Sequence, residues 1–219
     1  MWAHILSIVN TVQVNSVQVP PASTTSERPT MPNPNRLDAT ALARVAVFVA
    51  IIAVLSLTPG FSVIGVPLTA QTFGVMLAGA VLGSWLGALA MIVYLALIAV
   101  GLPIASGGTG GIGLFVGPTA GFLYGFVLGA FVVGAIVHLG NRVPQWWRTA
   151  LAMIVGGIVA VYLIGVPVLS LVTKLSLSAA TSSMAVFVPG DLIKAVLATL
   201  VVTTLVRVYP RAFRREWVN

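Results

Sequence analysis

The chain has no cysteine and very little charge. Among its 219 residues, Lys and Arg number 11, Asp and Glu number 4, and charged residues amount to 7%. A soluble domain carries about 25% charged and 45–50% apolar residues, whereas 58% of this chain is hydrophobic and its mean hydropathy is +1.07. The lack of cysteine excludes disulfides, thiolate metal sites and cysteine nucleophiles. The scarcity of charge excludes a soluble globular protein.

Charge is missing altogether from a long internal stretch. No Asp, Glu, Lys or Arg occurs between Arg44 and Arg142, so this part of the chain cannot surround itself with water. The lipid bilayer must be its solvent. The net charge of +7 does not indicate nucleic-acid binding, because the basic residues gather at the ends of apolar runs. That placement is typical of the cytoplasmic loops of a membrane protein.

Catalytic and ATP-binding motifs are absent as well. The sequence has no G-x-x-x-x-G-K-[ST] phosphate loop and no H-E-x-x-H zinc motif. It also lacks an acidic cluster that could hold two metal ions for phosphoryl transfer. These absences argue against a membrane enzyme, and we expect no cofactor. The function classes that remain are a binder, a carrier or a channel with an outward-facing pocket.

Four apolar segments have the length of a membrane crossing: 39–57, 118–140, 149–172 and 189–208. The further apolar segment 69–100 is ambiguous, because as one helix it would be about 48 Å long, against a hydrocarbon core of about 30 Å. It is too long for one crossing and slightly short for two. Its length alone does not decide between these possibilities.

The arginines decide how often the segment 69–100 crosses. Arginines near the N-terminus, in the loop around Arg142 and in the C-terminal tail should all face the cytoplasm. An even number of crossings must then separate Arg44 from Arg142, which requires two short helices that turn near Gly83-Ser84. We therefore predict an all-α integral membrane protein with six transmembrane helices over 39–208 and with both the N and C termini in the cytoplasm.

The two ends of the chain differ from this membrane domain. Residues 1–38 are rich in proline, serine and threonine and are expected to be disordered. Met31 is an alternative translation start, which would make the preceding residues an artefact. Residues 209–219 are predicted to form a basic cytoplasmic tail.

The outer connections and the small residues predict how the helices pack. The connections 58–68 and 101–117 are uncharged and apolar or glycine-rich, so we expect them to fold back over the helices as lids on an outward cavity. Small residues recur every fourth position, which lets helix backbones approach closely in lipid. Glycines with this spacing are expected to pack helices within the chain, and they are Gly79, Gly83, Gly87, Gly117, Gly121, Gly125 and Gly129. For the alanines of the first helix, contact with a partner protein is also open, and they are Ala39, Ala43, Ala46 and Ala50.

The strongest chemical signal is a pair of opposite charges at the start of the last helix. Pro189 and Gly190 break the preceding segment and place Asp191 in the first helical turn, where the helix dipole favours a carboxylate. Lys194 follows on the same face. An ionisable group inside the bilayer costs about 2.5–3.5 kcal/mol, so two of them indicate a polar cavity. The alternative is a helix cap with an ion pair that neutralises itself near the membrane surface.

Other polar side chains could join this pair, and they are Gln71, Tyr94, Ser106, Thr109, Thr119 and Tyr124. Each one, taken singly, is more often the member of a hydrogen bond between helices. From the residues alone, both uses stay open.

Several short motifs occur together in one order along the chain. They are 66–73 (VPLTAQTF), 78–83 (AGAVLG), 94–95 (YL), 101–103 (GLP), 107–111 (GGTGG), 117–122 (GPTAGF) and 187–194 (FVPGDLIK). In these motifs and their order, the chain resembles the BioY proteins. These are the biotin-binding S components of energy-coupling factor (ECF) transporters.

The resemblance implies a subunit that captures biotin at the outer face of the plasma membrane of a prokaryote. It implies a membrane coupling protein and two ATP-binding-cassette ATPases as partners in the lipid bilayer, which drive the subunit to tilt. The alanines Ala39, Ala43, Ala46 and Ala50 would then contact the coupling protein. No nucleic acid is implied. The alternatives are an S component for another small vitamin, and a passive channel or assembly subunit.

The resemblance also implies roles for individual residues in binding biotin. Asp191 would accept a hydrogen bond from a ureido N–H of biotin, and Lys194 would donate to the ureido oxygen or to the tail carboxylate. The glycine-rich loop would offer backbone N–H groups to a carboxylate. The remaining substrate-binding residues are predicted to be Tyr94, Gln71, Gly108, Gly110 and Thr119.

Overall fold

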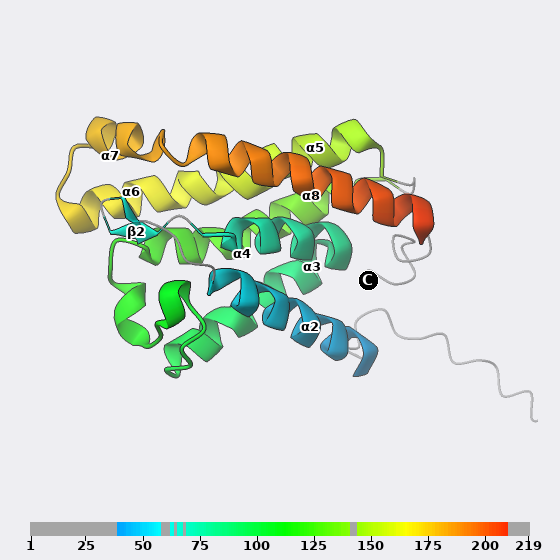
Figure 1. Ribbon diagram of the computed structural model, residues 1–219, viewed down its shortest axis with the longest axis horizontal. Coiled ribbons are helices and arrows are strands. Elements are labelled where there is room, and N and C mark those ends of the chain that lie inside the picture. The colour runs from blue at the N-terminus through cyan, green and yellow to red at the C-terminus, as the bar shows by residue number, and fades with distance from the viewer. Residues whose placement is uncertain (1–38, 58–61, 64, 68, 141–143, 210–219) are drawn as a thin grey trace, which may run out of the picture. The chain divides into compact units, whose positions relative to one another are not determined.

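Helices account for most of the described chain, as the apolar composition predicts. The structure is a computed structural model (Figure 1), and it describes residues 39–57, 62–63, 65–67, 69–140 and 144–209. The predicted disordered segment 1–38, the alternative start at Met31 and the tail beyond Tyr209 lie outside these residues.

The described elements follow one another as helices joined by short connections. The long helices are α2 (Ala39–Ser56), α3 (Gln71–Ala99), α4 (Ala120–Val137) and α8 (Val188–Val208). The helices α5 (Trp146–Ile154) and α6 (Val161–Thr173) are joined by the π-helical turn η3 (Val155–Ala160). The short elements are α7 (Leu177–Met184), the 3-10 turns η1 (Ser106–Gly108) and η2 (Ile112–Phe115), and the antiparallel strands β1 (Ser62–Val63) and β2 (Val66–Pro67).

Four of the described helical stretches are long and apolar enough to cross a membrane. They are α2, α3, α4 and the continuous stretch Trp146–Thr173 that α5, η3 and α6 form together. The pair α7 and α8, bent by 53°, is a fifth candidate. The structure thus agrees with the prediction of a helical membrane protein.

The helix α3 is folded back on itself at Gly83. This residue has φ 83° and ψ −179°, a backbone conformation that is essentially restricted to glycine. Gln71 and Tyr94 would be about 35 Å apart along a straight helix, yet the Nε2 of Gln71 lies 2.9 Å from the Tyr94 hydroxyl. A Cβ added to Gly87 would lie 2.9 Å from the Cα of Gly79. The turn that the arginines predict is therefore present, and α3 is a helical hairpin.

The glycines of α4 pack this helix closely against its neighbours. The α4 helix contacts α3 and also α5, η3 and α6. A Cβ added to Gly125 would lie 2.8 Å from the carbonyl oxygen of Val161, and one added to Gly129 would lie 2.9 Å from that of Gly156. Only glycine leaves room for backbones at this distance. The prediction that glycines pack helices within the chain is confirmed for Gly125 and Gly129, whereas Gly117 precedes α4 and a Cβ there would meet only the carbonyl oxygens of Gly113 and Leu114 in its own loop.

The two ends of the helical bundle differ in the elements that lie there. The helix α2 packs against α3, and α8 packs against α5 and α3. Figure 1 shows the start of α2 and the end of α8 at one end of the bundle, with β2 and α7 at the opposite end. The starts of α3 and α8 lie toward this second end, where the candidate site is found.

Candidate functional site

A cavity of about 470 Å³ lies where the starts of α3, α4 and α8 meet the connections between helices. Its size is that of a pocket for a small molecule. The walls are mostly apolar, with side chains such as Val66, Leu114, Phe122, Leu123 and Phe126. The polar lining side chains are Thr69, Gln71, Thr72, Ser106, Thr109, Thr119, Tyr162, Asp191 and Lys194.

Asp191 and Lys194 form an ion pair on the wall of this cavity. The Nζ of Lys194 lies 3.0 Å from the Oδ1 of Asp191, and the two side chains are 16% and 5% exposed, respectively. The break between α7 and α8 is the turn at residues 185–187, just before the predicted position at Pro189 and Gly190, and α8 then begins at Val188 with Asp191 in its first turn. The two residues are three positions apart in the helix, so their side chains lie on one face.

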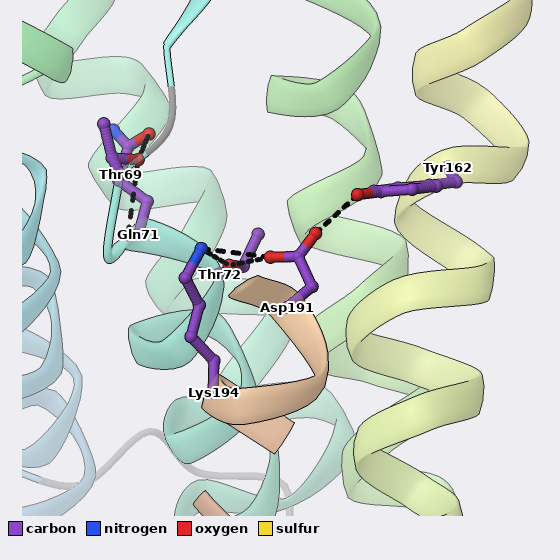
Figure 2. Close-up of polar contacts among 6 residues, drawn as sticks. All are labelled: Thr69, Gln71, Thr72, Tyr162, Asp191 and Lys194. Atoms are coloured by element: carbon purple, nitrogen blue, oxygen red, sulfur yellow. Dashed lines mark hydrogen bonds and ion pairs between the residues drawn. The ribbon is translucent and has the colours of Figure 1, made fainter. Parts of the chain in front are cut away.

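Hydroxyl groups from two other helices complete this charged network, as Figure 2 shows. Thr72 of α3 donates to the Oδ1 of Asp191 at 3.2 Å and accepts from the Nζ of Lys194 at 3.1 Å. Tyr162 of α6 donates to the Oδ2 of Asp191 at 2.5 Å. The carboxylate therefore bonds side chains of α3 and α6 instead of simply capping its own helix. We call Thr72, Tyr162, Asp191 and Lys194 the charged network.

The charged network keeps bonding capacity for a ligand. Two of the three N–H groups of Lys194 are directed at Thr72 and Asp191 within the described chain, which leaves one. A carboxylate offers about four lone-pair positions, and Asp191 uses three of them. Hydrogen bonds to charged groups are stronger than neutral ones. A small molecule with a donor next to an acceptor fits these two groups.

Gln71 stands at a second polar position on the cavity wall, apart from the charged network in Figure 2. It is the first residue of α3 and is 5% exposed. Its Oε1 accepts from the Thr69 hydroxyl at 3.0 Å, and its Nε2 donates to the Tyr94 hydroxyl at 2.9 Å. Tyr94 is fully buried and does not line the cavity. It lies behind Gln71.

The connections between helices form much of the cavity wall. Gly65, Val66 and Pro67 line it from the first connection, and six residues line it from the second: Ala105, Ser106, Gly107, Thr109, Gly113 and Leu114. The Ile104 carbonyl oxygen accepts from the Tyr94 hydroxyl at 2.9 Å and from the Ser56 hydroxyl. These bonds hold the second connection against α2 and α3, so this connection folds over the helices as expected. Of the first connection, the described residues 65–67 line the same cavity.

The predicted substrate-binding residues therefore have different positions. Asp191, Lys194, Gln71 and Thr119 line the cavity. Among the predicted loop glycines, neither Gly108 nor Gly110 lines it, and their neighbours Gly107, Thr109 and Gly113 do. The N–H of Gly108 donates to the Ala105 carbonyl at 3.0 Å, which closes a turn within the loop.

Sequence reasoning missed Thr72 and Tyr162, the hydroxyl partners of Asp191. Both lie inside apolar segments with no motif of catalysis or metal binding around them. Thr72 belongs to the motif 66–73, which could have drawn attention to it, whereas Tyr162 had only its hydroxyl at membrane depth as a signal. Ser and Thr hydroxyls usually bond the backbone of their own helix. The fold brings Thr72 to Asp191 across 119 positions of sequence.

The alanines of α2 lie away from the rest of the bundle. Ala39, Ala43, Ala46 and Ala50 are all exposed in the described structure, whereas α2 buries Val45, Val49 and Ile52. The alanine face is thus accessible to lipid or to another protein.

Comparison with known proteins identifies close relatives. Residues 28–211 match the model of the BioY family. A curated protein of Rhodobacter capsulatus, named biotin transporter BioY, is 46% identical over 178 residues, covering 77% of this chain and 94% of its own length. A protein of the same name from Rhizobium etli is 44% identical over 176 residues, with the same coverage.

A solved structure has the same fold. It is the crystal structure of the S-component for biotin from an ECF-type ABC transporter, with a TM-score of 0.71 and 30% sequence identity. The match covers 77% of this chain and 91% of the solved one. The likeness therefore extends over nearly the whole length of that protein.

Proposed function

Because the chain belongs to the BioY family, we propose that it is the S component of a transporter, which binds biotin and mediates its uptake. It is a multi-pass membrane protein and not an enzyme. The observation that carries the site is the ion pair of Asp191 and Lys194, which faces an otherwise mostly apolar cavity of about 470 Å³.

Biotin has the chemistry that this cavity can satisfy. Its ureido group has two N–H donors and one carbonyl acceptor, its thioether ring is apolar, and its tail ends in a carboxylate. Asp191 accepts from a ureido N–H, and the remaining N–H of Lys194 donates to the ureido oxygen or to the tail. Phe122, Leu123 and Phe126 pack on the apolar ring, and Gln71 and Thr119 supply further polar contacts. A buried donor or acceptor of the site that finds no hydrogen-bond partner on the ligand costs free energy. The site therefore favours ligands that have all these groups.

The proposed topology has six crossings, with both termini in the cytoplasm. The two arms of α3 count as separate crossings, supported by the turn at Gly83. The position of the start of α2 and the end of α8 at one end of the bundle supports an even number of crossings (Figure 1). The arginines before α2 and after α8 favour the cytoplasm at that end.

The proposed partners are a membrane coupling protein and two ATP-binding-cassette ATPases in the plasma membrane of a prokaryote. The chain has no phosphate loop, so the energy for uptake must come from other subunits. The exposed alanines of α2, Ala39, Ala43, Ala46 and Ala50, form the proposed contact with the coupling protein, since small residues let helices approach closely. The ATPases then tilt the subunit to deliver biotin inward.

Calorimetric titration of the detergent-solubilised protein with biotin tests this function. We expect saturable binding by the wild type and its loss in the double variant Asp191→Asn with Lys194→Ala. The control is Lys174→Ala, because Lys174 is exposed and does not line the cavity. No binding by the wild type, or equal binding by the double variant, contradicts the proposal. Binding of thiamine or riboflavin in place of biotin would identify another vitamin, and ligand-independent conductance in liposomes a channel.

A further inference from the structure

We infer that Tyr94 is a positioning residue for biotin binding, which acts through Gln71 without touching the ligand. This inference rests on the proposed function. It rests structurally on a chain of hydrogen bonds that starts at a backbone carbonyl behind the cavity wall and ends at the Gln71 carboxamide on that wall.

The direction of these hydrogen bonds is determined at the Ile104 carbonyl. A carbonyl oxygen can only accept, so the single hydroxyl hydrogen of Tyr94 is donated to Ile104, at 2.9 Å. Toward Gln71, which lies 2.9 Å away, the Tyr94 oxygen must then accept, and the only side-chain donor that Gln71 can offer is its NH₂ group. The hydroxyl of Thr69 meets the opposite end of the carboxamide, at 3.0 Å.

Burial makes this arrangement specific. Tyr94 is 0% exposed and Gln71 is 5% exposed, so water has little access to replace a missing partner. An isolated Gln side chain can rotate by 180° and exchange its donor and acceptor at little cost. Here such a flip would place the carboxamide oxygen against the Tyr94 oxygen, so that two acceptors face each other. It would also place the NH₂ group against the Thr69 hydroxyl, which donates to Oε1 in the structure. Tyr94 therefore determines which end of Gln71 offers a donor to the cavity and which offers an acceptor.

A second tyrosine provides a matched control. The Tyr124 hydroxyl also donates to a carbonyl of the second connection, that of Phe115, at 2.9 Å. Tyr124 is 43% exposed and does not line the cavity. Replacing either tyrosine by Phe removes one bond that holds the connection, but only Tyr94→Phe also frees Gln71. If Tyr94 acted only by holding the connection, the effect of Tyr94→Phe on binding would persist when Gln71 is also replaced.

The experiment compares biotin dissociation constants of the full chain in detergent. We expect Tyr94→Phe to raise the dissociation constant about tenfold, as for the loss of one hydrogen bond, and Tyr124→Phe to change it less than about twofold. Gln71→Leu should weaken binding at least as much as Tyr94→Phe. When Tyr94→Phe is added to Gln71→Leu, we expect less than about a twofold further change, because the group that Tyr94 positions is already absent.

The outcomes separate the two proposals. Absence of biotin binding by the wild type contradicts the function itself. Wild-type binding with no effect of Tyr94→Phe, or with the full tenfold loss also present in the Gln71→Leu background, overturns the role of Tyr94 alone. So does a Tyr94→Phe variant that melts at a lower temperature but binds biotin normally. If Tyr94→Phe does not fold, Thr69→Val removes the other bond to Gln71 and must show the same dependence on Gln71.

Discussion

Replacing one member of the Asp191–Lys194 pair should destabilise the fold, whereas replacing both should affect mainly the binding of biotin. In Asp191→Asn, one carbonyl oxygen takes the place of two carboxylate oxygens. Three donors, from Thr72, Tyr162 and Lys194, reach Asp191 in the structure. The amide NH₂ of Asn would face at least one of them, and Lys194 would lose its counter-charge.

The size of this effect follows from the burial of the pair. The side chain of Asp191 is 5% exposed and that of Lys194 is 16% exposed. Removing one partner of a buried pair costs about 3–5 kcal/mol. For a chain of this size, each kcal/mol lowers the melting temperature by roughly 2–4 °C, so Asp191→Asn should melt roughly 6–20 °C below the wild type.

The double variant Asp191→Leu with Lys194→Met removes both charges and keeps the apolar volume. The free energy of unfolding should then stay within about 1–2 kcal/mol of the wild type, because no buried charge is left without a partner. The hydroxyls of Thr72 and Tyr162 face the cavity, where water can replace their lost partner. Biotin affinity should nevertheless fall at least about 100-fold, since two charge-assisted bonds are absent.

Thermal unfolding followed by the fluorescence of the five tryptophans, together with calorimetric titration, tests both statements on the same samples. The reasoning fails if the double variant melts as low as Asp191→Asn, because the cost would then not come from an unpaired charge. It also fails if the double variant binds biotin like the wild type.

Three further variants and one control, Gly113→Ala, test the helix packing and the partner face. Gly83→Ala should lower the free energy of unfolding by about 1–3 kcal/mol because of the φ of 83°, whereas Gly113→Ala, with open space around it, should have little effect on thermal unfolding. Gly125→Val should destabilise by about 1–3 kcal/mol or more, since its side chain would meet the Val161 backbone; normal melting would contradict the close packing of α4. Ala46→Leu with Ala50→Leu should leave biotin binding unchanged but lower biotin uptake in cells that contain the coupling protein and ATPases; unaltered uptake would place the contact elsewhere.

Much of the fold could be predicted because it depends on local properties of the chain. Hydropathy over about 20 residues identifies a span without knowledge of its neighbours. The turn at Gly83 required one more step, the comparison of arginines at distant positions, and the structure has that turn. The packing of α4 through glycines was also predictable, because spacing by four places small residues on one helix face.

The candidate site was predictable only in part. The charged residues Asp191 and Lys194 stand out in a membrane segment, and both line the cavity. Tyr94, by contrast, belongs to the same set of polar residues at membrane depth as Gln71, and nothing in the sequence tells which of the two faces the cavity. The structure places Gln71 on the wall and Tyr94 behind it.

Hydropathy, charge and motif order are properties of the linear chain, so they are enough to predict that lipid surrounds this protein, that it is helical, where its charged pair lies and to which family it belongs. The identity of the hydroxyls that meet Asp191 depends instead on helix packing, since Thr72 and Tyr162 come from other helices. A hydroxyl in an apolar helix can bond its own backbone as well as a distant carboxylate. Because α3, α6 and α8 pack around one cavity, the hydroxyls of Thr72 and Tyr162 bond the carboxylate of Asp191.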